Sequence, residues 1–430
     1  MKKLLGIRRE DKNIWERRVP IIPEHIKILK DDHGIETIIQ PFEKRAFSDK
    51  EFKDVGATVN EDLSECPVVI AVKEIPIKLL QEDKTYMFFS HTIKGQEYNM
   101  PLLKRIMDLK CTLIDYELIT NNSGRRVVFF GKYAGIAGMI DALHGYGKRL
   151  KELGYSTPLL EIKPAYEYHS VEDAKTHIAK VGKDIEEQGL PAHKAPYVIG
   201  FMGYGNVSNG AQEIFDLLPH KEILPEELNS IDGDSKDFFY KVVFKEEHLV
   251  EPKDPSNSFV LQDYFDNPGK YKSKFEEYLP YLSLIVNAIY WTEESPRFLT
   301  KKYFKSIDEV KLDVVCDITC DIDGAVEFTV KSTESDNPAY VYNPNDDSIT
   351  DGYSGEGIVN IAVDNLPTEL PRNSSIEFSN ALNHFIPGIV NADKSKNFDD
   401  VNFPPEIKKA VIVYKGELTE DFKYLNEFIK

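Results

Sequence analysis

A glycine-rich turn between a buried strand and a helix constrains this chain most. Residues 200–210 read GFMGYGNVSNG; they follow an apolar strand predicted over Tyr197–Phe201 and precede a helix predicted over Gln212–Leu218. Glycines in such a turn let the backbone approach a pyrophosphate, which the N–H groups at the start of the helix then face. The motif predicts a dinucleotide site, although Ser208 replaces its third glycine and a purely structural glycine turn stays open as the alternative.

The next strand bears on the choice of dinucleotide. In the segment KEILPEEL, Pro225 stands where an acidic ligand of the adenosine ribose would usually lie, with Glu226 directly after it. A missing carboxylate removes a clash with a 2′-phosphate. The sequence therefore favours NADPH/NADP as the cofactor and leaves NAD open.

Short apolar runs alternate with helical patterns in both halves of the chain. This alternation predicts an α/β fold with largely parallel sheets. A helix rich in small residues is predicted over Gly131–Gly154, and its Ala134, Gly138 and Ala142 recur every fourth residue, which suits close packing at a domain junction. The polar, aromatic-rich segment 232–280 is predicted to be an irregular insertion, and the chain is predicted to end in helices over Ser375–Phe385 and Asp421–Ile429.

Three strands predicted in the first 120 residues end in ionisable side chains. VVIAVKE ends in Lys73 and Glu74, YMFFSHTIK leads to His91 and Lys94, and TLIDYE ends in Glu117. The carboxyl ends of parallel strands meet at one edge of a sheet, where ligands bind. A lysine or histidine that is partly desolvated there can move protons near neutral pH. Together the three strand ends predict a catalytic site, whereas any one alone would be an ordinary solvated strand end.

Two pairs of arginines suit acidic substrates. Arg17 and Arg18 follow the first strand, and Arg125 and Arg126 lie between two apolar runs. Arginine binds carboxylates through paired hydrogen bonds, so these positions suit a dicarboxylate. A surface salt bridge to nearby Glu16 is the alternative.

Composition excludes several other classes. The formal charge of −19 leaves no basic excess for binding nucleic acid or an anionic membrane. The four cysteines lie in apolar runs, which indicates a reducing, cytoplasmic setting and not a disulfide framework. The stretch 317–327 has Asp321, Asp323 and Gly324 at calcium-loop spacing, but a calcium site is rejected because Thr319 and Val330 occupy the first and twelfth ligand positions. We expect no metal, and no signal peptide or membrane span.

Several ordered motifs together resemble a known family. These are RREDKNIWERRVPIIPEHI, AVKEIP, FFSHTIKGQE, IDYE, GRRVVFFGKYAGIAGMIDALHGYG, GYGNVSNGAQEIFDLLP and DNLPTELPR. They resemble the lysine–ketoglutarate reductase domain of alpha-aminoadipic semialdehyde synthases, which is related to lysine-forming saccharopine dehydrogenases, alanine dehydrogenase and a transhydrogenase subunit. The resemblance runs from Leu4 to about Val413.

The resemblance implies two Rossmann-like doubly wound domains with a central cleft, the C-terminal segment returning to the first domain. Residues 1–135 and 372–430 would form the substrate domain, and residues 136–371 the dinucleotide domain. The implied reaction condenses L-lysine with 2-oxoglutarate and reduces the imine with NADPH to give saccharopine. A separate saccharopine-oxidising enzyme is an expected partner, because that part of the bifunctional proteins is absent from this chain.

The resemblance also implies roles for individual residues. Lys73 and His91 match the acid–base pair. Substrate-binding positions match Arg18, Arg126, Glu16, Glu74, Glu117 and Lys94. Cofactor-binding positions match Gly203, Gly205, Asn206, Val207, Ser208 and Asp317, with Asp321 nearby. Two alternatives stay open: another amino-acid dehydrogenase of the same superfamily, and a catalytically silent dinucleotide-binding partner of a saccharopine oxidase.

Overall fold

The computed structural model describes residues 3–231 and 233–429, which divide into two compact units. Unit 1 comprises residues 1–130 and 371–430, and unit 2 comprises residues 131–370. The sequence placed these boundaries at about 135 and 372. Within the described residues, each unit contains one eight-stranded sheet that is mostly parallel, so the predicted class of two Rossmann-like α/β domains is confirmed.

Unit 1 is built around a sheet with the strand order β18-β17-β6-β5-β4-β1-β2-β3. Its strands are β1 (Leu4–Ile7), β2 (Glu36–Ile39), β3 (Thr58–Val59), β4 (Val68–Ile70), β5 (Thr85–Phe88), β6 (Thr112–Asp115), β17 (Val411–Tyr414) and β18 (Glu417–Leu418). Its α-helices are α1 (Pro23–His33), α2 (Asp49–Asp54), α3 (Met100–Asp108), α10 (Pro371–Leu382), α11 (Ile386–Val390) and α12 (Pro405–Lys409). Strands β1, β4, β5 and β6 are parallel neighbours and buried throughout, as expected for a sheet covered on both faces.

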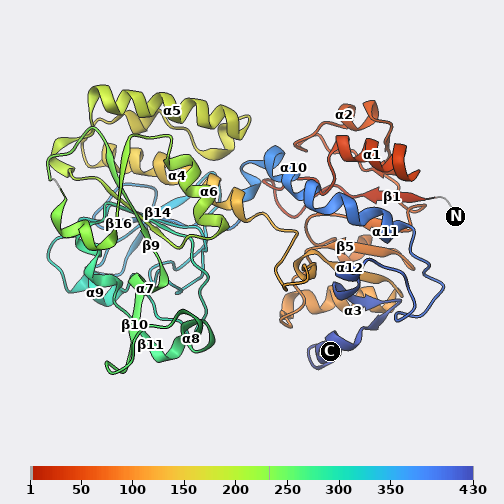
Figure 1. Cartoon of the computed structure of the whole chain (residues 1–430). Helices are drawn as coiled ribbons and strands as arrows, with labels where there is room; N and C mark the ends of the chain where they lie inside the picture. The colour runs from red at the N-terminus through yellow and green to blue at the C-terminus, as the bar shows by residue number, and fades with distance from the viewer. Residues whose placement is uncertain (1–2, 232, 430) are drawn as a thin grey trace. The chain divides into compact units, whose positions relative to one another are not determined.

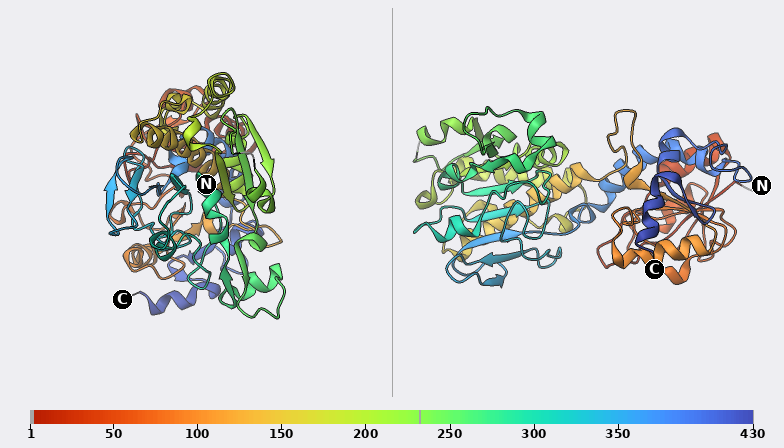
Figure 2. Two further views of the ribbon diagram at one scale, coloured as in Figure 1. Left: turned by 90° about the vertical axis from the view of Figure 1, so that its left-hand side faces the viewer. Right: turned by 90° about the horizontal axis from the view of Figure 1, so that it is seen from below.

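The C-terminal segment completes unit 1. Strand β17 pairs antiparallel with β6, so the end of the chain extends the sheet that its beginning forms. Figure 1 shows the blue C-terminal elements among the red and orange N-terminal ones, and Figure 2 shows the same mixing from two further sides. The helix predicted over Asp421–Ile429 is instead the 3₁₀ segment η13 (Glu420–Glu427).

Unit 2 has the strand order β15-β14-β16-β13-β12-β7-β9-β8. Its sheet strands are β7 (Val198–Met202), β8 (His220–Ile223), β9 (Phe239–Phe244), β12 (Leu284–Asn287), β13 (Val314–Asp317), β14 (Ala339–Tyr342), β15 (Ile349–Asp351) and β16 (Ile358–Ile361). A separate ribbon pairs β10 (Val250–Pro252) with β11 (Tyr271–Ser273). Its α-helices are α4 (Gly131–Glu152), α5 (Val171–Gln188), α6 (Asn206–Phe215), α7 (Glu246–Leu249), α8 (Leu261–Asp266) and α9 (Lys301–Lys305).

The segment predicted to be an irregular insertion contains an inner strand of this sheet. Strand β9 pairs with β7 on one side and with β8 on the other. The prediction was wrong because Asp237 and the aromatic Phe238, Phe239 and Tyr240 blur the border between a polar loop and a short apolar strand. Polar residues flank β9 in the sequence, so the strand was not recognised, although it is largely buried between β7 and β8.

Helix α4 begins unit 2 and packs closely on α6. A Cβ atom built on Gly135 would lie 1.8 Å from the carbonyl oxygen of Val207, and one built on Gly210 would lie 2.2 Å from that of Lys132. Side chains at either position would therefore push the helices apart. Among the described residues, none of the helices is long and apolar enough to span a membrane.

Candidate active site

The ionisable residues of unit 1 follow four neighbouring parallel strands. Glu10 and Lys12 lie past β1, Lys73 and Glu74 past β4, His91 past β5, and Glu117 just past β6. Because these strands are parallel, their carboxyl ends lie at one edge of the sheet.

Glu74 joins three of these segments by hydrogen bonds. Its Oε1 lies 2.6 Å from Nδ1 of His91, its Oε2 accepts from Nζ of Lys12 at 2.8 Å, and Nδ2 of Asn99 lies 3.3 Å from Oε1. Burial opposes ionisation of the carboxyl, but the bonds from His91 and Lys12 outweigh it and hold the pKa of Glu74 well below its ordinary value. Glu74 is therefore a carboxylate that orients the imidazole of His91.

The backbone at His91 is strained and firmly held. His91 has φ +49°, a left-handed conformation that is uncommon for residues with a side chain. The amide of Asn99 donates to the carbonyl of Ser90 at 2.8 Å, and Asp115 accepts from the N–H of Ser90 at 2.9 Å. Strain held by surrounding bonds is typical of functional positions, where it fixes a side chain in a needed direction.

Lys73 has a half-buried amine with a lowered pKa. Burial is the largest cause; the positive charges of Arg18 and Lys12 add to it, while Glu16 and Glu74 oppose it. Desolvation disfavours the charged ammonium, so a larger fraction of this amine is neutral near physiological pH than in water. A neutral lysine amine can accept a proton from a substrate.

Arg18 and Glu16 form a buried ion pair. Nε of Arg18 donates to Oε1 of Glu16 at 2.8 Å and Nη2 donates to Oε2 at 2.5 Å, with both side chains 1% exposed. The guanidinium also lies 4.1 Å from the centre of the Phe130 ring. Burial opposes ionisation of Glu16, but the charge and hydrogen bonds of Arg18 lower its pKa overall. Arg18 thus already uses one edge of its fork, and its predicted contact with a substrate carboxylate stays a prediction.

The remaining predicted substrate residues lie nearer the surface. Nη2 of Arg126 donates to Oε1 of Glu117, and about half of the Arg126 side chain is exposed. Lys94 is exposed in the loop after His91, where its backbone N–H donates to Gln96. The structure therefore pairs Arg126 with Glu117. Within the described part of the chain, the Lys94 side chain makes no hydrogen bond or ion pair, and only its backbone N–H is bonded.

In unit 2, the glycine turn forms an open site at the start of α6. Gly203 has φ +94°, and its N–H donates to the carbonyl of Phe244 at 3.0 Å. Gly205 is the residue before the helix, and a Cβ built on it meets no atom within 4 Å. Asn206 and Val207 form the first turn of α6, whose N–H groups suit a pyrophosphate. These four residues fit a dinucleotide.

Ser208 lies in a different environment from the other four. Its side chain is completely buried, and its hydroxyl accepts from Nε2 of Gln212 at 3.0 Å. The close helix approach usually assigned to the third glycine is made at Gly210 and Gly135. Ser208 therefore contributes packing on the inner side of the helix, and a direct contact with the cofactor stays a prediction.

Asp317 closes the turn after β13. Its carboxylate accepts from Asn287 at 2.8 Å, from Thr319 at 2.9 Å and from Thr329 at 2.6 Å, and the N–H of Cys320 lies 3.2 Å away. Burial raises the pKa of Asp317 despite these donors. The side chain is thus committed to the turn beside the end of β12, and its predicted contact with the cofactor is untested.

The sheet order changes the position that faces the adenosine ribose. In a dinucleotide fold this position follows the strand next to the first one. Strand β7 pairs with β12 and with β9, and β8 lies at the sheet edge beyond β9, so the position expected to face the ribose is that of Lys245 and not that of Pro225. Lys245 is exposed, and its backbone N–H donates to Nδ1 of His248 at 3.0 Å.

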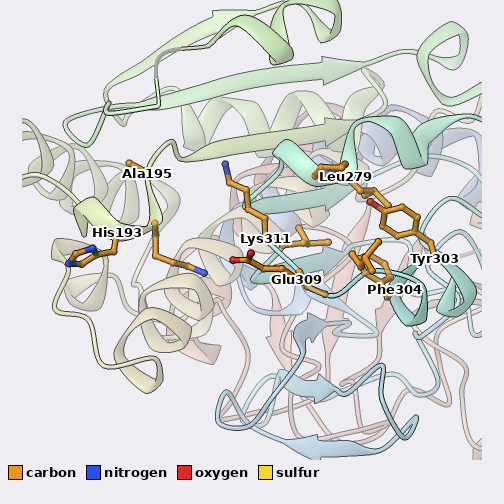
Figure 3. A pocket seen from close by; sticks show the side chains of 12 residues that line it. His193, Ala195, Leu279, Tyr303, Phe304, Glu309 and Lys311 are labelled. Atoms are coloured by element: carbon orange, nitrogen blue, oxygen red, sulfur yellow. The ribbon is translucent and has the colours of Figure 1, made fainter.

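A pocket of about 520 Å³ lies elsewhere in unit 2. It is lined by residues before β7, β12 and β13, including His193, Leu279 and Lys311 (Figure 3). These segments precede their strands, whereas the glycine turn follows β7. The pocket therefore lies at the amino ends of the strands and the glycine turn at their carboxyl ends. It is therefore separate from the predicted cofactor site.

Sequence reasoning missed Glu10, Lys12, Asn99 and Lys245. Glu10 and Lys12 follow β1 directly, so the argument used for the other strand ends would have found them. Asn99 precedes α3 and reaches Glu74 across 25 residues, and Lys245 required the sheet order. Neither of these two had a local signal.

Comparison with known proteins decides the family. The model for the N-terminal domain of alanine dehydrogenase/PNT matches residues 6–137, and the model for its C-terminal domain matches residues 256–421. The chain belongs to the alanine dehydrogenase/PNT family. The crystallised L-alanine dehydrogenase shares this family's fold with it, with a TM-score of 0.63 and 16% identity, over 99% of this chain and 100% of the other.

Within this family, the chain is similar to two alpha-aminoadipic semialdehyde synthases. It is 40% identical over 98% of its length to the alpha-aminoadipic semialdehyde synthase of Arabidopsis thaliana, and 36% identical over 99% to the mitochondrial one of Mus musculus. The chain spans 41% and 48% of those proteins, less than half of each. It is also 28% identical to the saccharopine dehydrogenase [NAD(+), L-lysine-forming] of Neurospora crassa, over 88% of this chain and 89% of that protein.

Proposed function

We propose that this chain is an NADPH-dependent lysine–2-oxoglutarate reductase that forms saccharopine. The observation that carries the proposal is the cluster at one edge of the unit 1 sheet: Lys73 with a lowered pKa, beside a His91 that Glu74 orients. The similarity to the synthases over 98% of the chain supports the substrate assignment.

The chemistry of condensation explains why such a cluster is needed. The ε-ammonium of lysine must lose a proton before its nitrogen attacks the ketone carbon of 2-oxoglutarate. When the C–N bond forms, the carbonyl electron pair moves to oxygen, which takes a proton. The new nitrogen centre loses one proton. The hydroxyl then gains a proton and leaves as water while the nitrogen lone pair forms the C=N bond, and the protonated imine that remains can accept hydride. In the proposed reaction, Lys73 and His91 carry these protons.

The substrates also carry charges that the site must balance. Arg126 and Arg18 would hold carboxylates, and Glu16, Glu74 and Glu117 would face amino groups or tune Lys73. Bidentate binding by arginine suits the two carboxylates of the keto acid better than it suits a smaller substrate such as pyruvate. This favours saccharopine formation over the alanine dehydrogenase reaction.

The glycine turn of unit 2 would hold the cofactor. Gly203, Gly205, Asn206 and Val207 would contact the pyrophosphate, and the nicotinamide supplies hydride when it is bound. An exposed lysine at position 245, with no carboxylate at that position, favours NADPH over NADH. A separate saccharopine-oxidising enzyme would use the product as its substrate. The cytoplasmic location expected from the cysteines stays a prediction.

The proposal is tested by following NADPH oxidation with lysine and 2-oxoglutarate together and with each omitted in turn. We expect oxidation to require both substrates and to be slower with NADH. Oxidation with ammonia and pyruvate alone would indicate the alanine-type enzyme. Binding of NADPH without turnover on any substrate would indicate a silent dinucleotide-binding partner.

A further inference from the structure

Glu10 is a buried carboxyl that bonds to the turn carrying Lys73. It is 3% exposed; Oε1 accepts from the N–H of Val72 at 2.6 Å, and Oε2 lies 3.0 Å from the N–H of Lys73. Glu10 follows β1 and Lys73 follows β4, and these two strands are parallel neighbours. The two hydrogen bonds therefore join the ends of two strands at the point where the Lys73 side chain leaves the backbone.

We infer that Glu10 is the positioning residue of Lys73: by binding both amides of the turn, it fixes the direction in which the lysine amine enters the site. The inference rests on the proposed function only in taking Lys73 as the residue that moves protons. Glu10 itself contacts the backbone of Lys73 and not the reacting atoms.

The local charges show that Glu10 has no structural ion pair to explain its burial. Among the described residues, the nearby arginines pair with other acids: Arg8 with Asp11 and Arg45 with Asp49. Burying a carboxyl costs free energy unless its oxygens are bonded, and here both are bonded to the Lys73 turn. Burying the Glu10 carboxyl at this strand end, without a basic partner among the described residues, costs more free energy than burying an apolar side chain would.

The groups facing Glu10 and Lys73 determine how the pair responds to pH. Burial, and then the charge of Glu16, raise the pKa of Glu10 to about 8, while the two amide bonds and Arg8 oppose the increase. Tyr116 and Arg45 also interact electrostatically with Glu10. Lys73 is faced by a different set: Arg18, Glu16, Lys12 and Glu74. Because Glu10 holds the backbone N–H of Lys73, a change at Glu10 should move the lysine amine relative to these charges and so change the titration of Lys73.

The test uses the full chain with Glu10→Gln, Glu10→Asp and a control, Ile106→Val, which removes a methyl group from the unit 1 core. A carboxamide keeps the volume but replaces one acceptor with a donor that faces an amide N–H. A shorter aspartate keeps both acceptors but withdraws them. We measure kcat and KM for both substrates, and the rate at which acetic anhydride labels Lys73 at each pH, read by peptide mass spectrometry.

We expect Glu10→Gln to lower kcat by roughly ten- to a hundredfold with KM changed only a few-fold, as for a displaced catalytic group. We also expect its Lys73 labelling profile to shift along the pH axis, with Glu10→Asp intermediate and Ile106→Val unchanged in both. An unchanged labelling profile in both Glu10 variants would overturn the inference. A shifted profile in the Glu10 variants, together with no turnover in the wild-type chain, would instead retain the positioning role and refute the proposed function.

Discussion

At the residue scale, the proposed reaction depends on Lys73, whose charged form is disfavoured by burial and by neighbouring positive charges. Lys73 lies in a half-buried turn. Burial and repulsion by Arg18 and Lys12 both lower its pKa and so favour loss of its proton. His91 follows the neighbouring strand β5 and is hydrogen-bonded to Glu74, the residue after Lys73, so it is the second group assigned to proton transfer in the proposed reaction.

Replacing Lys73 with methionine tests this arrangement. Methionine keeps much of the length and apolar contact of lysine but cannot carry a proton. We expect kcat for saccharopine formation to fall by at least about a hundredfold, the usual scale for removing a general acid or base. Affinity for NADPH, measured by quenching of protein fluorescence, should stay within a few-fold. An unchanged kcat would remove Lys73 from the mechanism.

Glu74 makes a prediction about stability and pH. Its pKa is lowered in the folded chain, so its ionised form contributes stability that is present above about pH 4.5 and lost as pH falls further. We therefore expect Glu74→Gln to lower the unfolding temperature more at pH 7 than at about pH 3.5. The exposed Glu82, changed to Gln, serves as the control. A loss that is equal at both pH values would contradict the assigned ion pair.

How much of the site the sequence predicted depends on where the partners lie. Lys73, Glu74 and His91 were predicted because each directly follows an apolar strand, which is a local signal. The bonds from Asn99 to Glu74 and from Glu10 to Lys73 join residues that only strand pairing brings together. Likewise, the pairing of Arg18 with Glu16 depends on the side-chain directions within a buried loop, which residue type alone does not give.

At the element scale, the order of strands decides which residue faces the cofactor's ribose. No local pattern indicates that β9 lies between β7 and β8, because β8 follows α6 directly and its position in the chain suggests that it is the neighbour of β7. Its exposed lysine and glutamate agree with an edge position. The longer α-helices and many of the buried strands could be predicted from apolar runs, but the order of the strands in the sheet could not.

Lys245 gives the corresponding prediction. An exposed lysine after β9 should attract the 2′-phosphate of NADPH. We expect Lys245→Ala to weaken NADPH binding about tenfold, which corresponds to about 1.4 kcal/mol, and to leave NADH binding nearly unchanged. Lys221→Ala, on the edge strand β8, is the matched control. An equal loss of affinity for NADPH and NADH would show that Lys245 does not contact the 2′-phosphate and would assign the position facing the ribose to another residue, such as Glu246.

The contact between α4 and α6 gives a prediction about packing. A methyl group on Gly135 would collide with the carbonyl of Val207, which cannot rotate away. We expect Gly135→Ala to lower the free energy of unfolding by about 1–3 kcal/mol and to weaken dinucleotide binding, because α6 must shift. Gly233, around which a Cβ would meet no atom within 4 Å, provides the control substitution to Ala. Equal stability of the two variants in urea would contradict the close contact.

At the scale of the whole molecule, the residues proposed for proton transfer and those proposed for cofactor binding belong to two different units. The first and last segments build the unit with Lys73, Glu74 and His91, and the middle segment builds the unit with the glycine turn. The fold class followed from the alternation of strands and helices, and the return of the C-terminal segment followed from the resemblance to the family. A proton-transfer site and a cofactor site on different units predict that neither unit alone turns over substrate.

The most direct test of the central claim is to follow the hydride. The full chain is incubated with lysine, 2-oxoglutarate and NADPH that carries deuterium at the transferable position of the nicotinamide, and the product is analysed by mass spectrometry. We predict saccharopine that is one mass unit heavier than with unlabelled NADPH, with the deuterium on the carbon that was the ketone of 2-oxoglutarate. Oxidation of NADPH without labelled saccharopine, or a labelled product lacking the lysine carbons, would contradict the account.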